Sequence, residues 1–547
     1  MKISRRSLFK SSGVAAGSLA LGPAGTLAKE AVAASPALRA RHGGGVTTLE
    51  RTLKRGKPNK KGWRALVAKP GQRHVVRDGL GVPGQPGRAT RRSPLVSFVQ
   101  MTDVHVVDAQ SPARLEAGEA VSGSASRPQE TMAAHVAEAM VRELNEIGAG
   151  PVTGRPFDLA IQTGDNSDNS QWNEIRWNID VLDGEVVTPD SGDPSRYEGV
   201  QDDDPAFYDE VFWHPHGTPE GLRKDLYRRK YGFPTVPGLL DKVRQPFQAT
   251  GLAFPWYAAF GNHDQLAQGN FPHPAANLRS PTGTLKNTSK GIRTVTADPN
   301  RRFVSRSEWV AEHFTTSGLP EGHGFTQSNL DADTGYYYFD EGSVRFVAMD
   351  TVNEHGGDDG SMGQTQFTWL KDLLVATTDK VVILYSHHAS WTMDNDRVGP
   401  DGEPGPRVLG EELVAELLKH DHVIAWVNGH THDNNVRAHV RDGGGGGFWE
   451  INTVSHIDWP QQSRVIEVVD NEDGTLSIFT TMVDHAAKLK MPKEFDTPVQ
   501  LAALSRLLAA NDPGVARENG TRGPGQSAGR KKDRNVELLV AAPAFMA

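Results

Sequence analysis

Short apolar runs recur along the middle of the chain, and each one ends in a cluster of polar residues. The five runs are Leu95–Met101, Phe157–Thr163, Phe254–Phe260, Val381–Ser386 and Val423–Asn428. Runs of this length and apolarity predict β-strands that are buried on both faces. Between them, apolar residues at helical spacing predict amphipathic helices over Glu130–Ile147, Gln364–Val375 and Gly410–His420. Strands that alternate with helices predict an α/β layered sheet.

The polar clusters contain the residue types that ligate metals. In chain order they are Asp103 with His105, Gly164-Asp165-Asn166, Gly261-Asn262-His263-Asp264, His387-His388 and Gly429-His430-Thr431-His432. Layered α/β sheets bind ligands beyond the carboxyl ends of their strands. All five clusters stand at that end, so we expect them to meet at one site.

Each cluster taken alone also has an ordinary explanation. An Asp-x-His pair or a Gly-Asp-Asn run is a common turn, and Asn262 with its neighbours could cap a helix. The chain contains no cysteine, which excludes disulfides, thiolate nucleophiles and Cys-ligated zinc. Any metal must therefore be held by His, Asp, Glu, Asn or backbone groups.

In this order the clusters resemble the calcineurin-like metallophosphoesterase superfamily, over about Pro94 to Val483. The resemblance implies a four-layer α/β/β/α sandwich with a dinuclear metal centre. It implies that metal one binds Asp103, His105, Asp165 and His432, and that metal two binds Asp165, Asn262, His387 and His430. Asp165 would bridge the two ions. His387 is preferred to His388 because the family's ligand is the first residue of such a pair.

A pair of adjacent cations suits phosphate ester hydrolysis. The centre keeps a net positive charge, and metal-bound water ionises near neutral pH to give a hydroxide nucleophile. The resemblance gives His263 the role of protonating the leaving group or stabilising the transition state, and Asp264 could orient and charge it. The alternative is that His263 only braces the ligands.

One position departs from part of the family. Purple acid phosphatases carry a tyrosine three residues after the bridging aspartate, where this chain has Asp168. A ferric-tyrosinate colour is therefore not expected, and Fe, Mn and Zn all stay open as the two ions. Asp168 and Asn169 could support the metal ligands from behind or could form an exposed turn, and we favour the turn.

The N-terminal residues carry a twin-arginine pattern around Arg5 and Arg6, an apolar stretch and a small-residue cleavage site at Ala31-Val32-Ala33. We expect a signal peptide at 1–34, and export by the twin-arginine machinery to the periplasm, the cell envelope or the medium. A basic Gly/Pro-rich leader at 35–93 would precede a catalytic domain at 94–490, with insertions at 170–249 and 265–336. Residues 491–547 would form a C-terminal tail whose apolar end docks back on the body.

The formal net charge of −8 argues against a general nucleic-acid partner. No segment after the N-terminus is apolar over a length that predicts stable membrane insertion. We expect an exported metal-dependent hydrolase of a small-molecule phosphate ester. The alternatives are a phosphodiesterase or nuclease of the same superfamily, and a non-catalytic cell-envelope binding module. The motifs do not separate monoesters from diesters.

Overall fold

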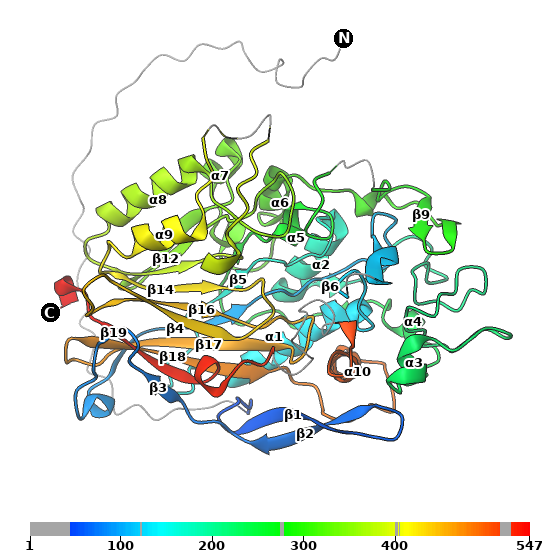
Figure 1. Ribbon diagram of the computed structural model, residues 1–547, viewed down its shortest axis with the longest axis horizontal. Coiled ribbons are helices and arrows are strands. Elements are labelled where there is room, and N and C mark those ends of the chain that lie inside the picture. Colours follow the sequence, from blue (N-terminus) through cyan, green and yellow to red (C-terminus); the bar gives the residue numbers. More distant parts are fainter. Residues whose placement is uncertain are drawn as a thin grey trace, which may run out of the picture. The chain divides into compact units, whose positions relative to one another are not determined.

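The computed structural model describes residues 44–120, 123–273, 278–399, 403, 405–514 and 527–546. By its internal contacts the chain divides into Met1–Leu38 and Arg39–Ala547. The expected signal peptide at 1–34 lies outside the described residues, so everything below concerns the second unit (Figure 1). Within the described part of the chain, no helix has the length and apolarity needed to span a bilayer.

A seven-stranded sheet forms one half of this unit. Its strand order is β3-β19-β18-β17-β4-β5-β8. The strands are β3 (Val75–Arg77), β4 (Ser93–Met101), β5 (Leu159–Thr163), β8 (Trp256–Ala259), β17 (Gln462–Asp470), β18 (Thr475–Asp484) and β19 (Val536–Ala541). Strands β4, β5 and β8 run parallel, so their carboxyl ends lie at the same edge.

A six-stranded sheet forms the other half, in the order β11-β12-β13-β14-β16-β15. Its strands are β11 (Tyr337–Glu341), β12 (Val344–Ala348), β13 (Val381–Tyr385), β14 (Val423–Asn428), β15 (Asn435–Val440) and β16 (Gly447–Asn452). Strands β12, β13, β14 and β16 are parallel to one another. Of the strands expected from the apolar runs, β13 and β14 lie at the centre of this sheet, whereas β4, β5 and β8 form one side of the seven-stranded sheet, with β8 at its edge.

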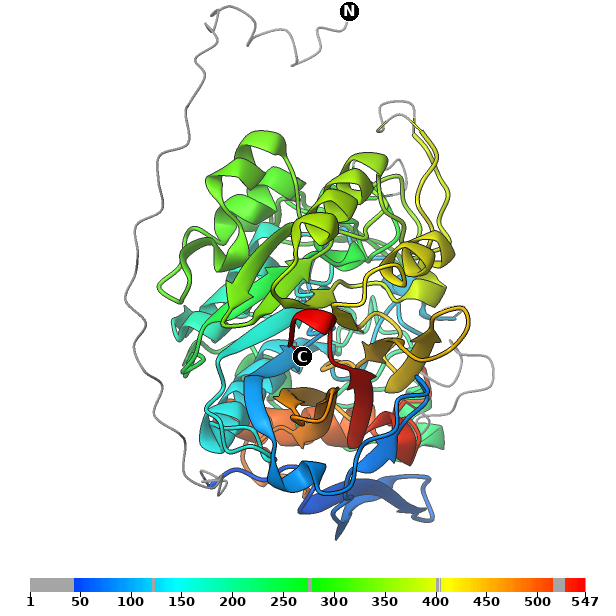
Figure 2. The ribbon, with the colours of Figure 1, turned by 90° about the vertical axis from the view of Figure 1, so that its left-hand side faces the viewer.

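The two sheets pack face to face around a shared core, in which the rings of Phe98 and Phe346 lie 5.1 Å apart. Helices α8 (Gln364–Ala376) and α9 (Gly410–Leu417) cover the outer face of the six-stranded sheet (Figures 1 and 2). Helices α1 (Ala133–Ile147), α2 (Trp172–Asp183) and α10 (Pro498–Ala509) lie on the side of the seven-stranded sheet. The expected α/β/β/α layering is confirmed.

Helix α1 illustrates how local sequence sets these layers. Its expected stripe of Val136, Met140 and Leu144 is buried. The helix ends where Gly148 adopts a left-handed φ of 63°, a conformation that costs glycine little.

The segment expected to be a leader contributes regular structure. Strands β1 (Arg51–Pro58) and β2 (Arg64–Pro70) form an antiparallel hairpin, and β3 pairs in parallel with β19. The C-terminal segment adds α10 to the helical layer and β19 to the sheet. Residues on both sides of the expected catalytic domain therefore complete its seven-stranded sheet.

The two expected insertions contain short elements. The first begins with α2, the crossover helix between β5 and β8, and continues with β6 (Val186–Val187), α3 (Leu226–Lys230), α4 (Leu239–Lys242) and β7 (Phe247–Gln248). The second holds β9 (Leu285–Thr288), β10 (Gly291–Thr294), α6 (Arg306–Glu312) and α7 (Gln327–Ala332). Short α5 (Asn262–Gln265) directly follows β8.

Candidate metal centre

The structure brings the seven expected metal ligands together at the carboxyl ends of five strands. They follow β4 (Asp103, His105), β5 (Asp165), β8 (Asn262), β13 (His387) and β14 (His430, His432). Most of these side chains are almost completely buried. The centre therefore draws on both sheets.

Four of these residues enclose a first candidate cation position. Nε2 of His105 lies 3.2 Å from Nε2 of His432. His432 Nε2 lies 3.3 Å from Asp103 Oδ1, and His105 Nε2 lies 3.5 Å from Asp165 Oδ2. Nitrogen and carboxylate oxygen atoms that converge at these distances fit one four-coordinate ion.

A second group adjoins the first through Asp165. Its Oδ2 lies 3.2 Å from Nε2 of His387, and His387 Nε2 lies 3.2 Å from Nδ1 of His430. Asn262 is the remaining candidate ligand of this group: its Nδ2 donates to the Gly269 carbonyl over 3.0 Å, whereas its buried Oδ1 has no hydrogen-bond partner among the described residues. A buried amide oxygen without a partner is costly, and a cation would satisfy it.

The backbone at this centre is held in an uncommon conformation. Five of the seven expected ligands have a left-handed φ, namely Asp103 (49°), His105 (48°), Asp165 (52°), His430 (70°) and His432 (52°). Such a conformation costs a non-glycine residue about 1–3 kcal/mol, and it concentrates at functional sites. Glycines next to the ligands permit the close approach: a Cβ at Gly261 would lie 2.1 Å from the Asp165 amide nitrogen.

Three ligand histidines are oriented through their second ring nitrogen. Nδ1 of His105 donates to Asp168 Oδ1 over 2.9 Å, and Nδ1 of His432 donates to Asp458 Oδ2 over 2.7 Å. Nδ1 of His387 donates to the Thr163 carbonyl over 2.9 Å. Each bond leaves the Nε2 lone pair directed at the centre, which is the tautomer that a metal ligand requires.

Buried guanidinium groups hold the two carboxylates in place. Arg114 bonds to Asp168 and also donates to Glu130 Oε2 over 2.9 Å. Arg127 Nε donates to Asp458 Oδ1 over 3.0 Å. The pKa values of both aspartates are held below their ordinary range: burial acts to raise them, but the neighbouring arginine and histidine outweigh it.

The carboxylates of the centre favour positive charge at two of its four candidate ligand histidines, whereas burial and neighbouring histidines lower the pKa of His105 and His430. Burial acts to lower the pKa of His432, yet the carboxylates of Asp103 and Asp458 raise it to about 10. The pKa of His387 is raised in the same way, against burial, by Asp165 and Asp103. The negative potential that favours a protonated imidazole at these positions also attracts a divalent cation. The donor set therefore fits a pair of metal ions.

His388 does not share this arrangement, although it lies beside His387. Its Nδ1 bonds to Thr351 Oγ1 and its Nε2 donates to the Asp358 carbonyl, both over 2.9 Å. Both nitrogens are thus occupied, and no lone pair is left for a cation. His387 is the better ligand of the pair.

His263 lies at the edge of the centre with part of its side chain exposed. Its Nδ1 donates to the Asp168 carbonyl over 2.7 Å, and its Nε2 lies 4.0 Å from Asp165 Oδ2. Burial opposes protonation, but the charges of Asp165 and Asp168 raise the pKa of His263 to about 9. A protonated imidazole here can donate to a phosphoryl or alkoxide oxygen.

The structure gives Asp264 a different task from the one expected. Its carboxylate accepts bonds from the backbone amides of Gly261 (3.0 Å), Asn166 (3.1 Å) and Ser167 (2.9 Å). It therefore ties the β5 and β8 loops together, while Asp168 lies beside the His263 ring. The interpretation of Asp168 as an exposed turn is wrong, because its side chain is buried among Arg114, His105 and His263.

Comparison with known proteins supports this geometry. A family model described as calcineurin-like phosphoesterase matches residues 239–434. Residues 239–434 are thus similar to calcineurin-like phosphoesterases. The match supports a metal-dependent phosphoester hydrolase. The match contains Asn262, His387, His430 and His432, and the fold adds Asp103, His105 and Asp165 from earlier strands.

Solved structures and curated proteins give two further comparisons. A dimetal phosphatase from Danio rerio shares 12% identity with the chain, in an alignment that covers 72% of this chain and 100% of that one, with a TM-score of 0.35. At that score the likeness adds nothing to the family match. No curated protein matches the chain significantly.

Sequence reasoning missed Asp458, Arg127 and Arg114. Asp458 is separated from His432 by 26 residues and stands in a loop before a strand, where no spacing marks it. Arg114 and Arg127 lie in an irregular segment after β4. Only the folded arrangement shows that these residues support the ligands.

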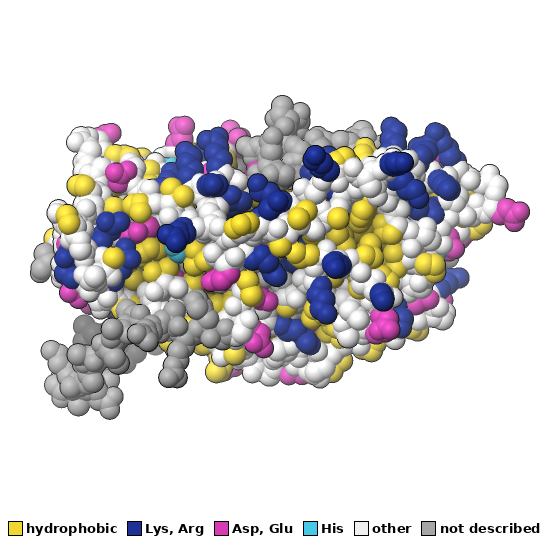
Figure 3. All heavy atoms as spheres, turned by 90° about the horizontal axis from the view of Figure 1, so that it is seen from below, with side chains coloured by type: hydrophobic (Ala, Val, Ile, Leu, Met, Phe, Trp, Pro, Cys, Tyr) yellow, Lys and Arg dark blue, Asp and Glu magenta, His cyan; other side chains and the backbone are white. Residues whose placement is uncertain are grey.

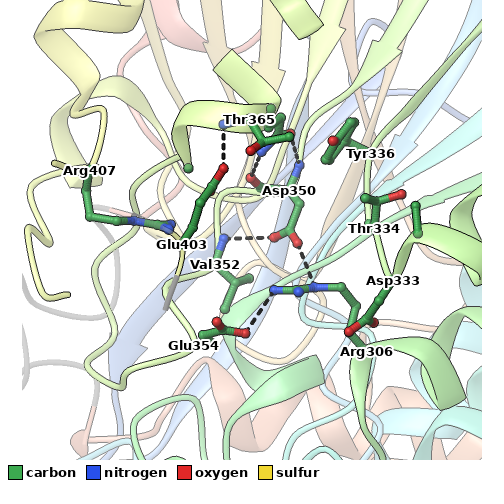
Figure 4. Close-up of a pocket in the computed structure, with 14 residues that line it drawn as sticks. Arg306, Asp333, Thr334, Tyr336, Asp350, Val352, Glu354, Thr365, Glu403 and Arg407 are labelled. Atoms are coloured by element: carbon green, nitrogen blue, oxygen red, sulfur yellow. Dashed lines mark hydrogen bonds and ion pairs between the residues drawn. The ribbon is translucent and has the colours of Figure 1, made fainter. Parts of the chain in front are cut away.

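A pocket of about 260 Å³ is separate from the centre (Figure 4). Its charged lining residues are Arg306, Asp333, Asp350, Glu354, Glu403 and Arg407. Arg306 Nε pairs with Asp350 Oδ2 over 3.1 Å inside it. None of the seven expected ligands lines this pocket, and its excess of carboxylates opposes a phosphate group.

Proposed function

We propose that the chain is an exported phosphohydrolase whose paired metal site activates water for attack on a phosphate ester. Bound at the two positions, a pair of cations would supply an ionised water and neutralise charge on the phosphoryl oxygens. The observation that carries the proposal is the convergence of His105 with His432, and of His387 with His430, on the two sides of Asp165. Fe, Mn and Zn all suit imidazole, amide and carboxylate ligands.

The residues around the centre have distinct tasks in this proposal. Asp165 joins the two positions, and its carboxylate also accepts from the His263 amide over 2.9 Å. That bond fixes where the His263 backbone stands relative to the bridge. Because Nδ1 of His263 is held by the Asp168 carbonyl, its Nε2 is the atom that carries the transferable proton.

His263 is placed to act as the general acid. The departing alkoxide of a phosphate ester needs a proton or a strong hydrogen bond, which Nε2–H of a protonated His263 would supply. The proton would pass from Nε2 to the leaving oxygen. The carboxylates of Asp168 and Asp165 favour the protonated form of the imidazole, which is the form that donates.

Export belongs to the same proposal and rests on the N-terminal sequence alone. The Arg5-Arg6 pair with its following apolar stretch is typical of twin-arginine signals, which carry folded proteins. Changing both arginines to lysine should leave the chain inside the cell that makes it. Cell fractionation of the two forms tests this, and equal export of both would contradict it.

Turnover tests the catalytic part. Wild type should hydrolyse p-nitrophenyl phosphate or bis-p-nitrophenyl phosphate when Mn or Zn is supplied, and the ratio of the two separates a monoesterase from a diesterase. Asp165→Ala should abolish both activities, because it removes a ligand shared by both positions. A folded wild-type protein with bound metal and no turnover of either ester would indicate the non-catalytic binding module instead.

A further inference from the structure

The β1–β2 hairpin carries a strong local excess of positive charge. The segment from Arg51 to Arg77 contains ten Lys or Arg residues and no Asp or Glu, in a chain whose net charge is −8. Such an asymmetry predicts a partner of opposite charge at this face.

The two faces of the hairpin differ. Leu53 and Leu66 pack inward with Leu507 of α10. Because side chains alternate along a strand, Lys54 and its cross-strand partner Val67 point outward. Lys69 lies on the same outer face, opposite Thr52. Val67 is 40% exposed.

Further lysines are exposed at the tip of the hairpin and in the segment that contains α3. Lys57, Lys60 and Lys61 are exposed at the tip. The Trp63 ring packs edge-on against Phe233 at 5.3 Å, and a Cβ at Gly62 would lie 2.8 Å from the Lys230 carbonyl. The exposed side chains of Lys224 and Lys230 belong to this neighbouring segment.

A third segment borders the hairpin on the side of α10. Leu489 packs into the same apolar cluster as Leu53 and Leu66. Its neighbours Lys488 and Lys490 are exposed, and Met491 is 38% exposed. Farther along, Glu494 and Asp496 bring negative charge, but Asp496 pairs with Lys242 at 2.5 Å.

We name these lysines and the apolar side chains between them the basic face. It comprises Lys54, Lys57, Lys60, Lys61, Val67, Lys69, Lys224, Lys230, Lys488, Lys490 and Met491. Among the described residues, none of these lysines has an acidic partner within 4.0 Å. Figure 3 looks onto this side, where Lys and Arg side chains are spread with hydrophobic side chains between them.

The chemistry of the face favours a layer of headgroups over a single polymer chain. Most of the exposed cations in these segments are lysines, with Arg73 and Arg223 the exceptions, and lysines attract phosphate as point charges without the fixed bidentate geometry of arginine. The cavity beside the hairpin, lined by Thr52 and Leu53, holds about 20 Å³, which is room for one water molecule. Trp63 packs against Phe233, so it offers no free stacking platform of the kind that single-stranded nucleic acid uses.

We infer that the basic face docks the protein on the surface of an anionic lipid bilayer. The lysines would approach the headgroup phosphates while Val67 and Met491 enter the interfacial layer, without any segment crossing the membrane. The negative charge of the remaining chain would orient the molecule with this face toward the lipid. This inference is independent of the metal centre.

Vesicle sedimentation tests the inference with the full chain. Wild type should sediment with vesicles of phosphatidylcholine and phosphatidylglycerol, and should stay in solution with phosphatidylcholine alone. Added salt should weaken the binding, since it screens exposed charges. The double variant Lys60→Gln, Lys61→Gln should bind about 25-fold more weakly, because each lysine near an anionic surface contributes about fivefold.

A matched variant controls for net charge. Lys290→Gln with Lys419→Gln removes the same charge from exposed positions on other elements and should bind as wild type does. Asp165→Ala should also bind normally, which separates docking from recognition at the metal centre. Retained phosphatase activity would show that the Lys60, Lys61 variant is folded.

Four results would overturn the inference. Wild type could fail to bind the anionic vesicles, or could bind both vesicle types equally. The Lys290, Lys419 variant could lose as much binding as the Lys60, Lys61 variant. Retention on immobilised polyphosphate without vesicle binding would assign the face to a linear polyanion and would reject the bilayer.

Discussion

The Asp168 carboxylate accepts a hydrogen bond from Nδ1 of His105 over 2.9 Å, and the same residue lies 3.4 Å from Nδ1 of His263. One buried side chain therefore orients a candidate metal ligand and charges the candidate general acid. Arg114 compensates its negative charge.

Asp168→Asn should weaken metal binding by about 10- to 100-fold, the usual cost of losing a carboxylate that orients a ligand histidine. Dialysis against a graded metal buffer, followed by elemental analysis, measures this. Asp340→Asn removes a carboxylate that pairs with Arg345 near the surface and should leave metal affinity unchanged. Equal metal affinity in Asp168→Asn and wild type would show that Asp168 does not support the centre.

The His387-His388 pair gives a prediction that separates two adjacent imidazoles. His387→Ala should lose metal at the position shared with His430, because its Nε2 faces Asp165 at 3.2 Å. His388→Gln should keep both ions, since each nitrogen of His388 already bonds to the protein. The metal content of the two purified variants shows which histidine is the ligand. Loss of metal in His388→Gln but not in His387→Ala would make His388 the ligand instead.

The role of His263 should be visible in how the rate of hydrolysis depends on the leaving group. His263→Gln is expected to slow hydrolysis of esters with poor leaving groups by about 10²- to 10⁴-fold, the range for general acid catalysis. Esters with good leaving groups need little protonation and should be slowed much less. A series of substituted phenyl phosphates gives the dependence on leaving-group pKa. A uniform loss across the series would indicate that His263 only braces the ligands.

Acid should destabilise the fold partly through His135, which lies buried in α1 with its ring 5.1 Å from Phe247. Burial lowers the pKa of His135 to about 3 from an ordinary 6.5. As the pH falls below about 6.5 the unfolded chain gains a proton here that the folded chain does not bind, so stability falls with it. Between about pH 7 and about pH 5 this group should cost about 2 kcal/mol.

His135→Phe should therefore lose less stability over that range than wild type. Urea unfolding at the two pH values measures the difference. An unchanged slope in His135→Phe would show that this histidine does not govern the acid response.

The strands that lead into the site could be predicted from the sequence, because their long apolar runs can be recognised without tertiary information. The sequence also predicted which polar clusters would meet, since parallel strands bring their carboxyl ends to one edge. It did not predict that β3 and β19, from the two ends of the chain, would complete the sheet. Short strands such as Val75–Arg77 acquire their pairing only from a partner far away in sequence.

The supporting residues of the centre were beyond sequence reasoning for a related reason. Asp168 was visible three residues after Asp165, but a loop aspartate shows no sign of burial until Arg114 and His263 pack against it. Asp264 likewise holds two loops together through bonds that only the folded chain shows, and no spacing marks Asp458 as a partner of His432. Spacing along the chain identifies ligand types, whereas the hydrogen bonds that orient them are set by the fold.

Metal analysis of the purified chain tests the central claim most directly. Wild type is exchanged into Mn or Zn, weakly bound ions are removed, and two ions per chain should remain. Asp165→Ala lacks the shared ligand and should retain neither ion firmly. Wild type that binds no ion, or Asp165→Ala that binds as many as wild type, would contradict the account of a paired site built around Asp165.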